Sequence, residues 1–88
     1  MQNHYRDKFD IMESILDCAN GNEVKQVKIL AKANIPHNVF KEHLLFLYQN
    51  GLIEYTQLQR TYRTTTKGID FLSIINKMKT DIIHHNPV

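Results

Sequence analysis

The chain of 88 residues contains one cysteine, Cys18, which excludes an internal disulfide and a cysteine-based zinc cluster. Cys18 stands among apolar residues and suits a small buried hydrophobe, with a redox sensor or an intermolecular disulfide as the alternative. No apolar run approaches the roughly 18 residues that a membrane span needs. The first ten residues are polar and charged, unlike a signal peptide. We therefore expect a cytoplasmic protein with no membrane partner.

A strong excess of one charge is also missing, because the formal net charge is only +2. This balance permits DNA binding without proving it, and it falls short of the cationic composition of proteins that coat nucleic acid by charge alone. A chain this short buries only about 60% of its unfolded surface, so one domain with a partner subunit is expected.

Motifs of catalysis are absent as well. We find no glycine-rich phosphate loop, no carboxylate pair in a plausible cleft and no Cys-His or Ser-His-Asp arrangement. His43 falls on the apolar side of an expected helix and reads as a core histidine rather than a metal ligand. The sequence thus predicts no enzyme, cofactor, metal or small-molecule ligand.

What is present is an ordered series of helical patterns. Apolar residues at helical spacing predict a first helix over about 4–19, which Asn20-Gly21 closes. Asn22 is expected to cap a second helix. Its apolar, covered side is formed by Val24, Val27, Leu30 and Ala31, and Ile29 is expected to be half covered by the neighbouring helix. Asn34-Ile35-Pro36 then makes a short, stiff turn.

A third helix is predicted over 37–50, with Val39, Phe40, His43, Leu44, Phe46 and Leu47 on its covered side. Gly51 suits the left-handed position after that helix, and Leu52 can contact Leu47 as in a Schellman motif. Alternating segments over 53–57 and 61–65 suit a two-stranded ribbon. A last helix follows over about 66–83.

A tight turn between two helices, followed at once by a hairpin, is the plan of a winged helix-turn-helix. The predicted fold class is α+β, mainly α, with three helices, a two-stranded wing and a carboxy-terminal dimerisation helix. We expect one domain over 1–88, with a core over 4–66 and the dimerisation helix over 67–83.

Specific residues carry a family resemblance: Ile29-Leu30, Ala33-Asn34-Ile35, Leu44, Leu47, Gly51-Leu52-Ile53, Tyr62, Thr65-Thr66-Lys67-Gly68 and Phe71-Leu72. In their order and spacing the chain resembles the small archaeal winged-helix proteins that dimerise through a long carboxy-terminal helix. That group includes chromatin-associated proteins and transcription regulators. The resemblance runs from Arg6 to Ile83 and implies DNA binding as a homodimer.

The sequence departs from the family pattern at three positions. Val27, Pro36 and His43 stand where the family tends to have Thr, Ser and Tyr. Pro36 replaces a capping hydroxyl by a preset backbone and keeps the turn, whereas Val27 removes a polar group near the start of the second helix. The last helix is short for the group, with about two heptads, so a weaker dimer is expected.

The exposed side of the third helix offers groups that can read a major groove. Asn38 can pair with adenine, Lys41 with guanine or phosphate, and Leu45 can contact a thymine methyl. The predicted base contacts are His37, Asn38, Lys41, Leu45 and Gln49. The alternative is that these are ordinary solvated residues.

Basic residues on the second helix and in or beside the wing are expected to contact phosphates and to position the protein. They are Lys25, Lys28, Lys32, Arg60 and Arg63. A solvated helix face would also explain the three lysines, but the acidic residues are concentrated on the first helix. Charge is therefore segregated by element.

The last helix carries an apolar stripe formed by Phe71, Ile75, Met78 and Ile82. It either packs on the first helix, which is expected to cover Ile69 and Leu72, or crosses the same helix of a second chain as a short coiled coil. A helix of about 18 residues is about 27 Å long and would overrun so small a core. This favours a homodimer interface.

The leading hypothesis is a sequence-preferring double-stranded DNA-binding protein, a nucleoid-associated transcription regulator that binds an inverted repeat. Two alternatives stay open. One is an architectural chromatin protein with little sequence preference, and the other is a protein-interaction module that docks through Leu45 and Tyr48 without binding DNA.

Overall fold

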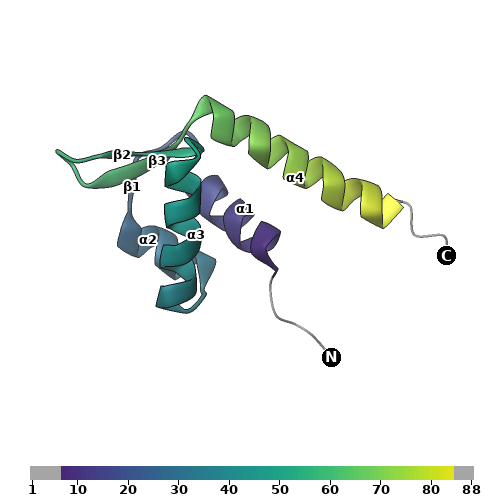
Figure 1. Cartoon of the computed structure of the whole chain (residues 1–88), viewed down its shortest axis with the longest axis horizontal. Coiled ribbons are helices and arrows are strands. Elements are labelled where there is room, and N and C mark those ends of the chain that lie inside the picture. The colour runs from purple at the N-terminus through teal and green to yellow at the C-terminus, as the bar shows by residue number, and fades with distance from the viewer. Residues whose placement is uncertain (1–6, 85–88) are drawn as a thin grey trace.

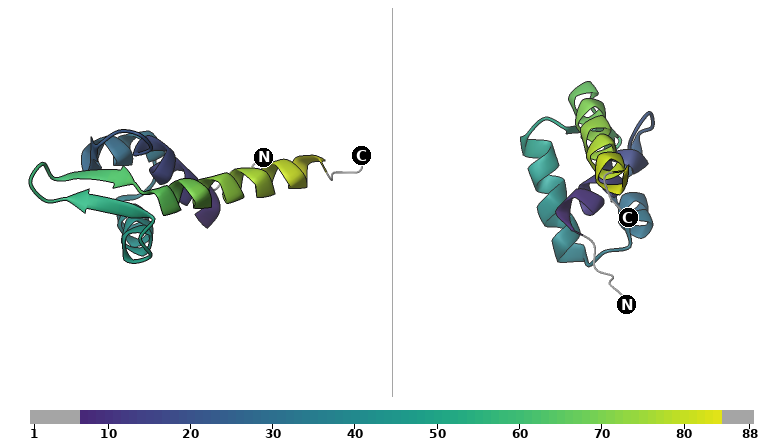
Figure 2. Two further views of the ribbon diagram at one scale, coloured as in Figure 1. Left: turned by 90° about the horizontal axis from the view of Figure 1, so that it is seen from above. Right: turned by 90° about the vertical axis from the view of Figure 1, so that its right-hand side faces the viewer.

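A computed structural model describes residues 7–84 of the chain. The elements are α1 (Lys8–Cys18), β1 (Val24–Lys25), α2 (Gln26–Ala33), α3 (His37–Gln49), β2 (Ile53–Thr56), β3 (Thr61–Thr64) and α4 (Thr66–His84). The β2–β3 hairpin projects from one end of the molecule and the end of α4 from the other (Figure 1). Figure 2 shows the same separation from above. The arrangement confirms the predicted winged helix-turn-helix, α+β and mainly α.

Helix α1 lies at the centre and contacts α2, α3 and α4. It begins later than predicted, because the Asp7 carboxylate accepts the Asp10 N–H at 2.9 Å and caps the helix. Ile15 and Leu16 are fully buried. Gly21 has a φ of 82°, the left-handed geometry expected of the glycine after this helix.

The prediction that Asn22 caps the second helix is wrong. Val24 and Lys25 form a third strand instead, paired with Tyr62 and Thr61, so the sheet has the order β1-β3-β2. The Thr61 hydroxyl also donates to the Glu23 carboxylate at 2.9 Å. Pairing with the free edge of β3 satisfies backbone groups that a longer helix would leave to water, and tertiary contact overrides the local helical pattern.

The later start of α2 changes its buried face. Val27, predicted to be covered, is 71% exposed, whereas Ile29 is fully buried rather than half covered. Ile29 and Ala33, four residues apart, form the buried stripe of this short helix. Val27 therefore presents its side chain to the surroundings and not to the core.

Helix α3 ends as the sequence predicts. Gly51 has a φ of 72°, its N–H donates to the Tyr48 carbonyl at 3.1 Å, and the Leu52 N–H donates to the Leu47 carbonyl at 2.9 Å. These are the two hydrogen bonds of a Schellman motif. One residue of the covered side differs, because Phe46 is 48% exposed.

The segment from Thr65 to Gly68 leads from β3 into α4 and is hydrogen-bonded to the residues that end α3. The Thr65 hydroxyl donates to the Gly51 carbonyl at 2.7 Å and accepts the Gly68 N–H at 3.0 Å, which caps α4. The Lys67 ammonium donates to the Asn50 carbonyl at 3.1 Å, at the negative end of the α3 dipole. We call this segment the α3–α4 corner.

Gly68 is required at the corner because its backbone lies too close to the Leu52 carbonyl for any side chain to fit. A Cβ built on Gly68 would lie 2.0 Å from the Leu52 carbonyl oxygen, which belongs to the backbone and has no side-chain freedom. The same oxygen accepts the Thr65 N–H at 3.1 Å. Only a residue without a side chain lets α4 start this close to the end of α3.

The wing is anchored at its base by Thr64. Its N–H donates to the Ala19 carbonyl at 3.0 Å, and its buried hydroxyl donates to the Leu16 carbonyl at 2.7 Å. Both acceptors lie in the last turn of α1 or just beyond it, where helix carbonyls have no intrahelical partner. The hairpin is thereby fixed to the central helix.

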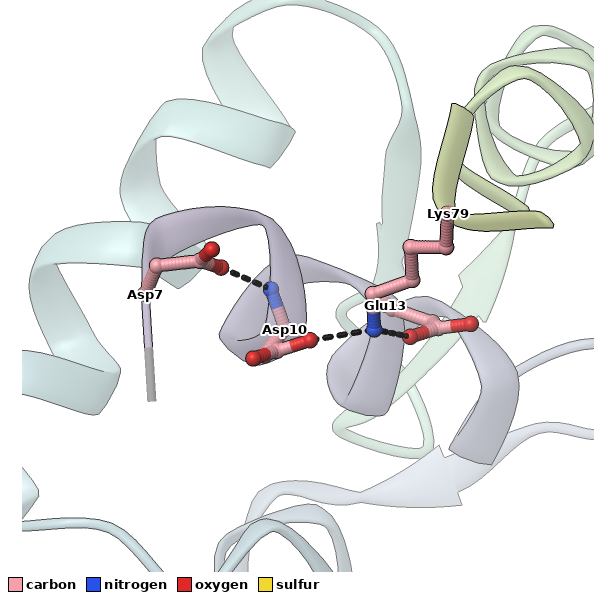
Figure 3. Close-up of polar contacts among 4 residues, drawn as sticks. All are labelled: Asp7, Asp10, Glu13 and Lys79. Carbon is pink, nitrogen blue, oxygen red and sulfur yellow. Dashed lines mark hydrogen bonds and ion pairs between the residues drawn. The ribbon is translucent and has the colours of Figure 1, made fainter. Parts of the chain in front are cut away.

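Helix α4 runs antiparallel to α1 and is fastened near its far end by an ion pair. The Lys79 ammonium binds the Glu13 carboxylate at 2.6 Å and also contacts the Asp10 carboxylate (Figure 3). Leu72 is buried as expected, but Ile69 is 43% exposed rather than covered by α1. None of the helices in the described range is long and apolar enough to cross a membrane.

We expect Gly68→Ala to lower the free energy of unfolding by about 2–3 kcal/mol or more, because the corner must open to admit the methyl group. Urea unfolding followed by circular dichroism measures this change. Ser73→Ala, at an exposed position of the same helix, is the control and should change stability by less than about 0.5 kcal/mol. Equal stability of the two variants would contradict the close approach.

Lys79→Met tests the ion pair. Hydrogen bonds from the ammonium to Asp10 and then Glu13 raise the pKa of Lys79 above its usual 10.5. Because the pKa is raised in the folded state, Lys79 contributes its full stabilisation at pH values below 10.5, the usual pKa. This contribution is lost as the pH rises through the pKa of the folded state. We expect a loss of about 0.5–1 kcal/mol at pH 7, since the groups are partly exposed, and no difference between variant and parent once the pH is well above the raised pKa of Lys79. A difference that persists there would mean that the ion pair is not its cause.

Candidate nucleic-acid interface

The outer face of α3 is free of contacts with the core. Phe40, Leu44 and Leu47 are buried on its inner side, and the opposite side of the helix points outward. All residues predicted to contact bases are exposed: His37, Asn38, Lys41, Leu45 and Gln49. Asn38, Lys41, Leu45 and Gln49 follow one another along one face at helical spacing. A side of α3 that bears amide, ammonium and methyl groups is thus presented to the surroundings.

A cleft of about 280 Å³ separates α3 from the wing. Residues from α2, α3 and both strands of the hairpin line it: Gln26, Lys41, Leu44, Leu45, Tyr48, Tyr55 and Tyr62. Tyr55 and Tyr62 face each other across the ladder, with ring centroids 4.8 Å apart. Lys41 and Leu45 therefore border the cleft as well as the outer face of α3.

The tyrosines supply hydroxyl donors beside the helix. Burial raises the pKa of Tyr62 above 10.0, and the nearby phenols of Tyr55 and Tyr48 add to the effect. The Tyr62 hydroxyl therefore stays protonated at neutral pH. Protein–DNA interfaces use tyrosine hydroxyls to contact phosphate oxygens, and a backbone that passes over the cleft would meet such donors.

Sequence reasoning missed most of the cleft. Gln26, Tyr55 and Tyr62 were not among the expected contacts, and Tyr48 entered only as a residue that docks a protein. The signal for the tyrosine pair was present, because a tight hairpin between 53–57 and 61–65 sets residues 55 and 62 opposite each other. No pattern in the sequence placed Gln26 here, since the second helix was expected to begin earlier.

Two of the predicted phosphate contacts come together at the turn of the wing. Lys25 lies in β1 and its ammonium donates to the Gln59 carbonyl at 3.4 Å. Arg60 lies next to Gln59 in the turn, with a left-handed φ of 56°. Both side chains are exposed. The wing turn, residues 57–60, therefore carries positive charge from two elements.

Lys28 and Lys32 lie elsewhere. They line a shallow hollow with Asp17 and Cys18 of α1, on the side of α2 away from the cleft. The structure thus separates these lysines from the outer face of α3 and sets them beside an acidic group. Cys18, half-buried and a free thiol, packs against the core as a small hydrophobe.

Arg63 is set apart as well. It pairs across the ladder with Glu54, whereas Tyr55 pairs with Tyr62. Because neighbouring residues of a strand point to opposite faces, Arg63 and Glu54 share the face away from the tyrosines. A carboxylate opposite Arg63 reduces the positive potential at that position.

The residues predicted for a dimer interface differ in how far their side chains are exposed. Ile75 is 1% exposed and buried within its own chain, so it offers no surface to a second copy. Met78 is 41% exposed, and Phe71 is half-buried against the core. The Ile82 side chain lies outside the described residues. Ile74, which was not predicted, is 55% exposed on the same flank of α4 as Met78.

A second hollow lies among α1, α3 and α4, between Phe9, Phe46 and Phe71, with His43 in its wall. The His43 ring is hydrogen-bonded through Nδ1 to the Val39 carbonyl at 2.8 Å and is partly buried, as the core interpretation expected. Within residues 7–80, no group of three or more His, Cys, Asp or Glu side chains could hold a metal ion.

The chain matches a family of known proteins. A family model described as "Winged helix-turn-helix" matches residues 5–82, which is most of the chain. No curated protein matches it.

If the wing turn and the outer face of α3 meet DNA, Lys25→Ala should weaken binding to every duplex alike and lower the salt slope by about 1. Lys32→Ala is the matched control, because it removes the same charge from the side of α2 that faces Asp17. Fluorescence anisotropy at several salt concentrations measures both. An equal loss in the two variants would show that the duplex covers the α1–α2 side instead.

Proposed function

The chain belongs to the winged helix-turn-helix family, and we propose that it is a sequence-preferring double-stranded DNA-binding protein that regulates transcription as a homodimer. In this proposal α3 enters the major groove and the wing lies against the flanking backbone. Such a protein works on the chromosome, so we expect it in the cytoplasm, associated with the nucleoid. We propose no catalytic activity and no cofactor.

The observation that carries the proposal is the outer face of α3, which no part of the described chain covers. Its exposed residues border a cleft with tyrosine hydroxyls, and the cationic wing turn lies beyond that cleft. Donors for phosphate thus lie on the wing side of a helix of the size that a major groove admits. An uncovered helix beside such donors fits a groove-reading role.

Sequence preference would come from three side chains of α3. Asn38 can make two hydrogen bonds to an adenine edge, Lys41 can donate to guanine or to phosphate, and Leu45 can contact a thymine methyl. A good bidentate base contact is worth about 1–3 kcal/mol of discrimination. We therefore expect Asn38→Ala to relax base preference at one position of each half-site more than it lowers affinity for unrelated sequences.

The proposed dimer is formed by the flank of α4 that bears Ile74 and Met78, next to Phe71. These side chains leave apolar surface in water although the helix is fastened to α1 as far as Lys79. A second copy would remove that surface from water. Two-fold symmetry would then require an inverted repeat with half-sites about one helical turn, or a multiple of it, apart.

The charge distribution sets the expected salt dependence. Lys25, Lys41 and Arg60 are the cations on the side of the cleft and wing turn, about six per dimer. With each neutralising one phosphate, the log–log slope of affinity against salt should be about −5. This is a moderate value, in keeping with a formal net charge of +2 per chain.

Selection from a random duplex pool at two salt concentrations tests the proposal, on protein whose mass in solution has been determined. We expect an enriched inverted repeat bound by a dimer. Binding without enrichment would replace the regulator by an architectural chromatin protein.

A protein-interaction module is the second candidate, because Leu45 and Tyr48 on the outer face of α3 are 55% and 53% exposed. Aromatic anchors are typical of protein interfaces. Failure to bind any duplex at low salt would favour this role over DNA recognition.

A further inference from the structure

The turn of the wing carries an apolar side chain at its tip. Leu58 is 89% exposed, the most exposed large apolar residue that the structure describes. Its neighbours in the turn are Gln57, Gln59 and Arg60, all exposed and polar. Turns are usually made of small polar residues or glycine, so a leucine at this position presents methyl groups where the hairpin ends.

The turn is held in place rather than free. Lys25 donates to the Gln59 carbonyl at 3.4 Å, and β1 and β2 pair with β3 on either side. The hairpin projects away from the helices, so its tip reaches surroundings that the rest of the chain does not (Figure 1). An apolar group on such a support keeps its position when it meets a partner.

From this geometry we propose that Leu58 is a wedge that enters the minor groove next to the site of α3 and partly unstacks one base step. The inference rests on the proposed DNA binding and adds to it a deformation of the duplex. Minor-groove proteins combine arginine, lysine and glutamine, which read the groove, with an apolar side chain inserted between bases. The wing turn unites these groups in one short segment.

The wedge would add a preference that no base contact of α3 supplies. Pyrimidine–purine steps such as TA and CA kink and unstack most easily. Insertion of Leu58 would therefore favour sites with such a step in the flank that the wing reaches. Arg60, beside the leucine, would favour the same flank when its minor groove is narrow and strongly negative.

The test uses duplexes that carry TA and CA steps on both sides of the bound site, with 2-aminopurine placed in turn at each adenine of those steps. Its fluorescence rises when the base leaves the stack. We expect the parent protein to raise the emission several-fold at one flanking step and to bring dyes at the two ends of the duplex closer together. Leu58→Asn should abolish both effects and weaken binding by about tenfold or less, because the cost of unstacking disappears with the contact.

Ser73→Ala, at an exposed position of α4 outside the wing, is the control and should keep both signals. Leu58 is exposed, so its replacement should leave the thermal unfolding midpoint of the protein unchanged. Binding without any 2-aminopurine signal, or a signal that Leu58→Asn retains, would overturn the wedge while DNA binding stands. Absence of binding to every duplex would instead refute the proposed function, and the wedge with it.

Discussion

The close approach of Gly68 to the Leu52 carbonyl is the constraint on which the molecule depends. That oxygen lies just beyond the Schellman motif that ends α3, and Thr65 and Gly68 pack against it where β3 passes into α4. The direction of α3, the base of the wing and the start of α4 are thus fixed at one place. A small core of short helices gains from such a joint, because few buried contacts are available to hold each element separately.

The joint also explains how charge and function are distributed. With α3 and the hairpin fixed to α1, one side of the molecule collects the bare face of α3, the tyrosine cleft and the cationic wing turn. The acidic groups of α1 are used elsewhere: Asp10 and Glu13 bind Lys79, and Asp17 lies beside Lys28 and Lys32. The net charge is small, but its placement leaves the proposed DNA side free of most carboxylates.

Much of the fold could be predicted from local signals. Asn34-Ile35-Pro36, Gly51 and Thr65 to Gly68 are turn and cap residues whose backbone needs are strong. The third strand could not be predicted, because Val24 and Lys25 are extended only through pairing with β3. The outward face of α3 followed from helical spacing, whereas the positions of Lys28, Lys32, Arg63 and Ile75 depended on the start of α2, on strand register and on how α1 covers α4.

The central claim is that α3 and the wing form one DNA-binding side. An NMR titration of the ¹⁵N-labelled protein with a short duplex tests it most directly, because each backbone amide reports its own surroundings. The account predicts shift changes along the outer face of α3, at Tyr55 and Tyr62 and in the wing turn, with little change around Lys79. Changes centred instead on the hollow between Phe9, Phe46 and Phe71, or on Lys28 and Lys32, would contradict it.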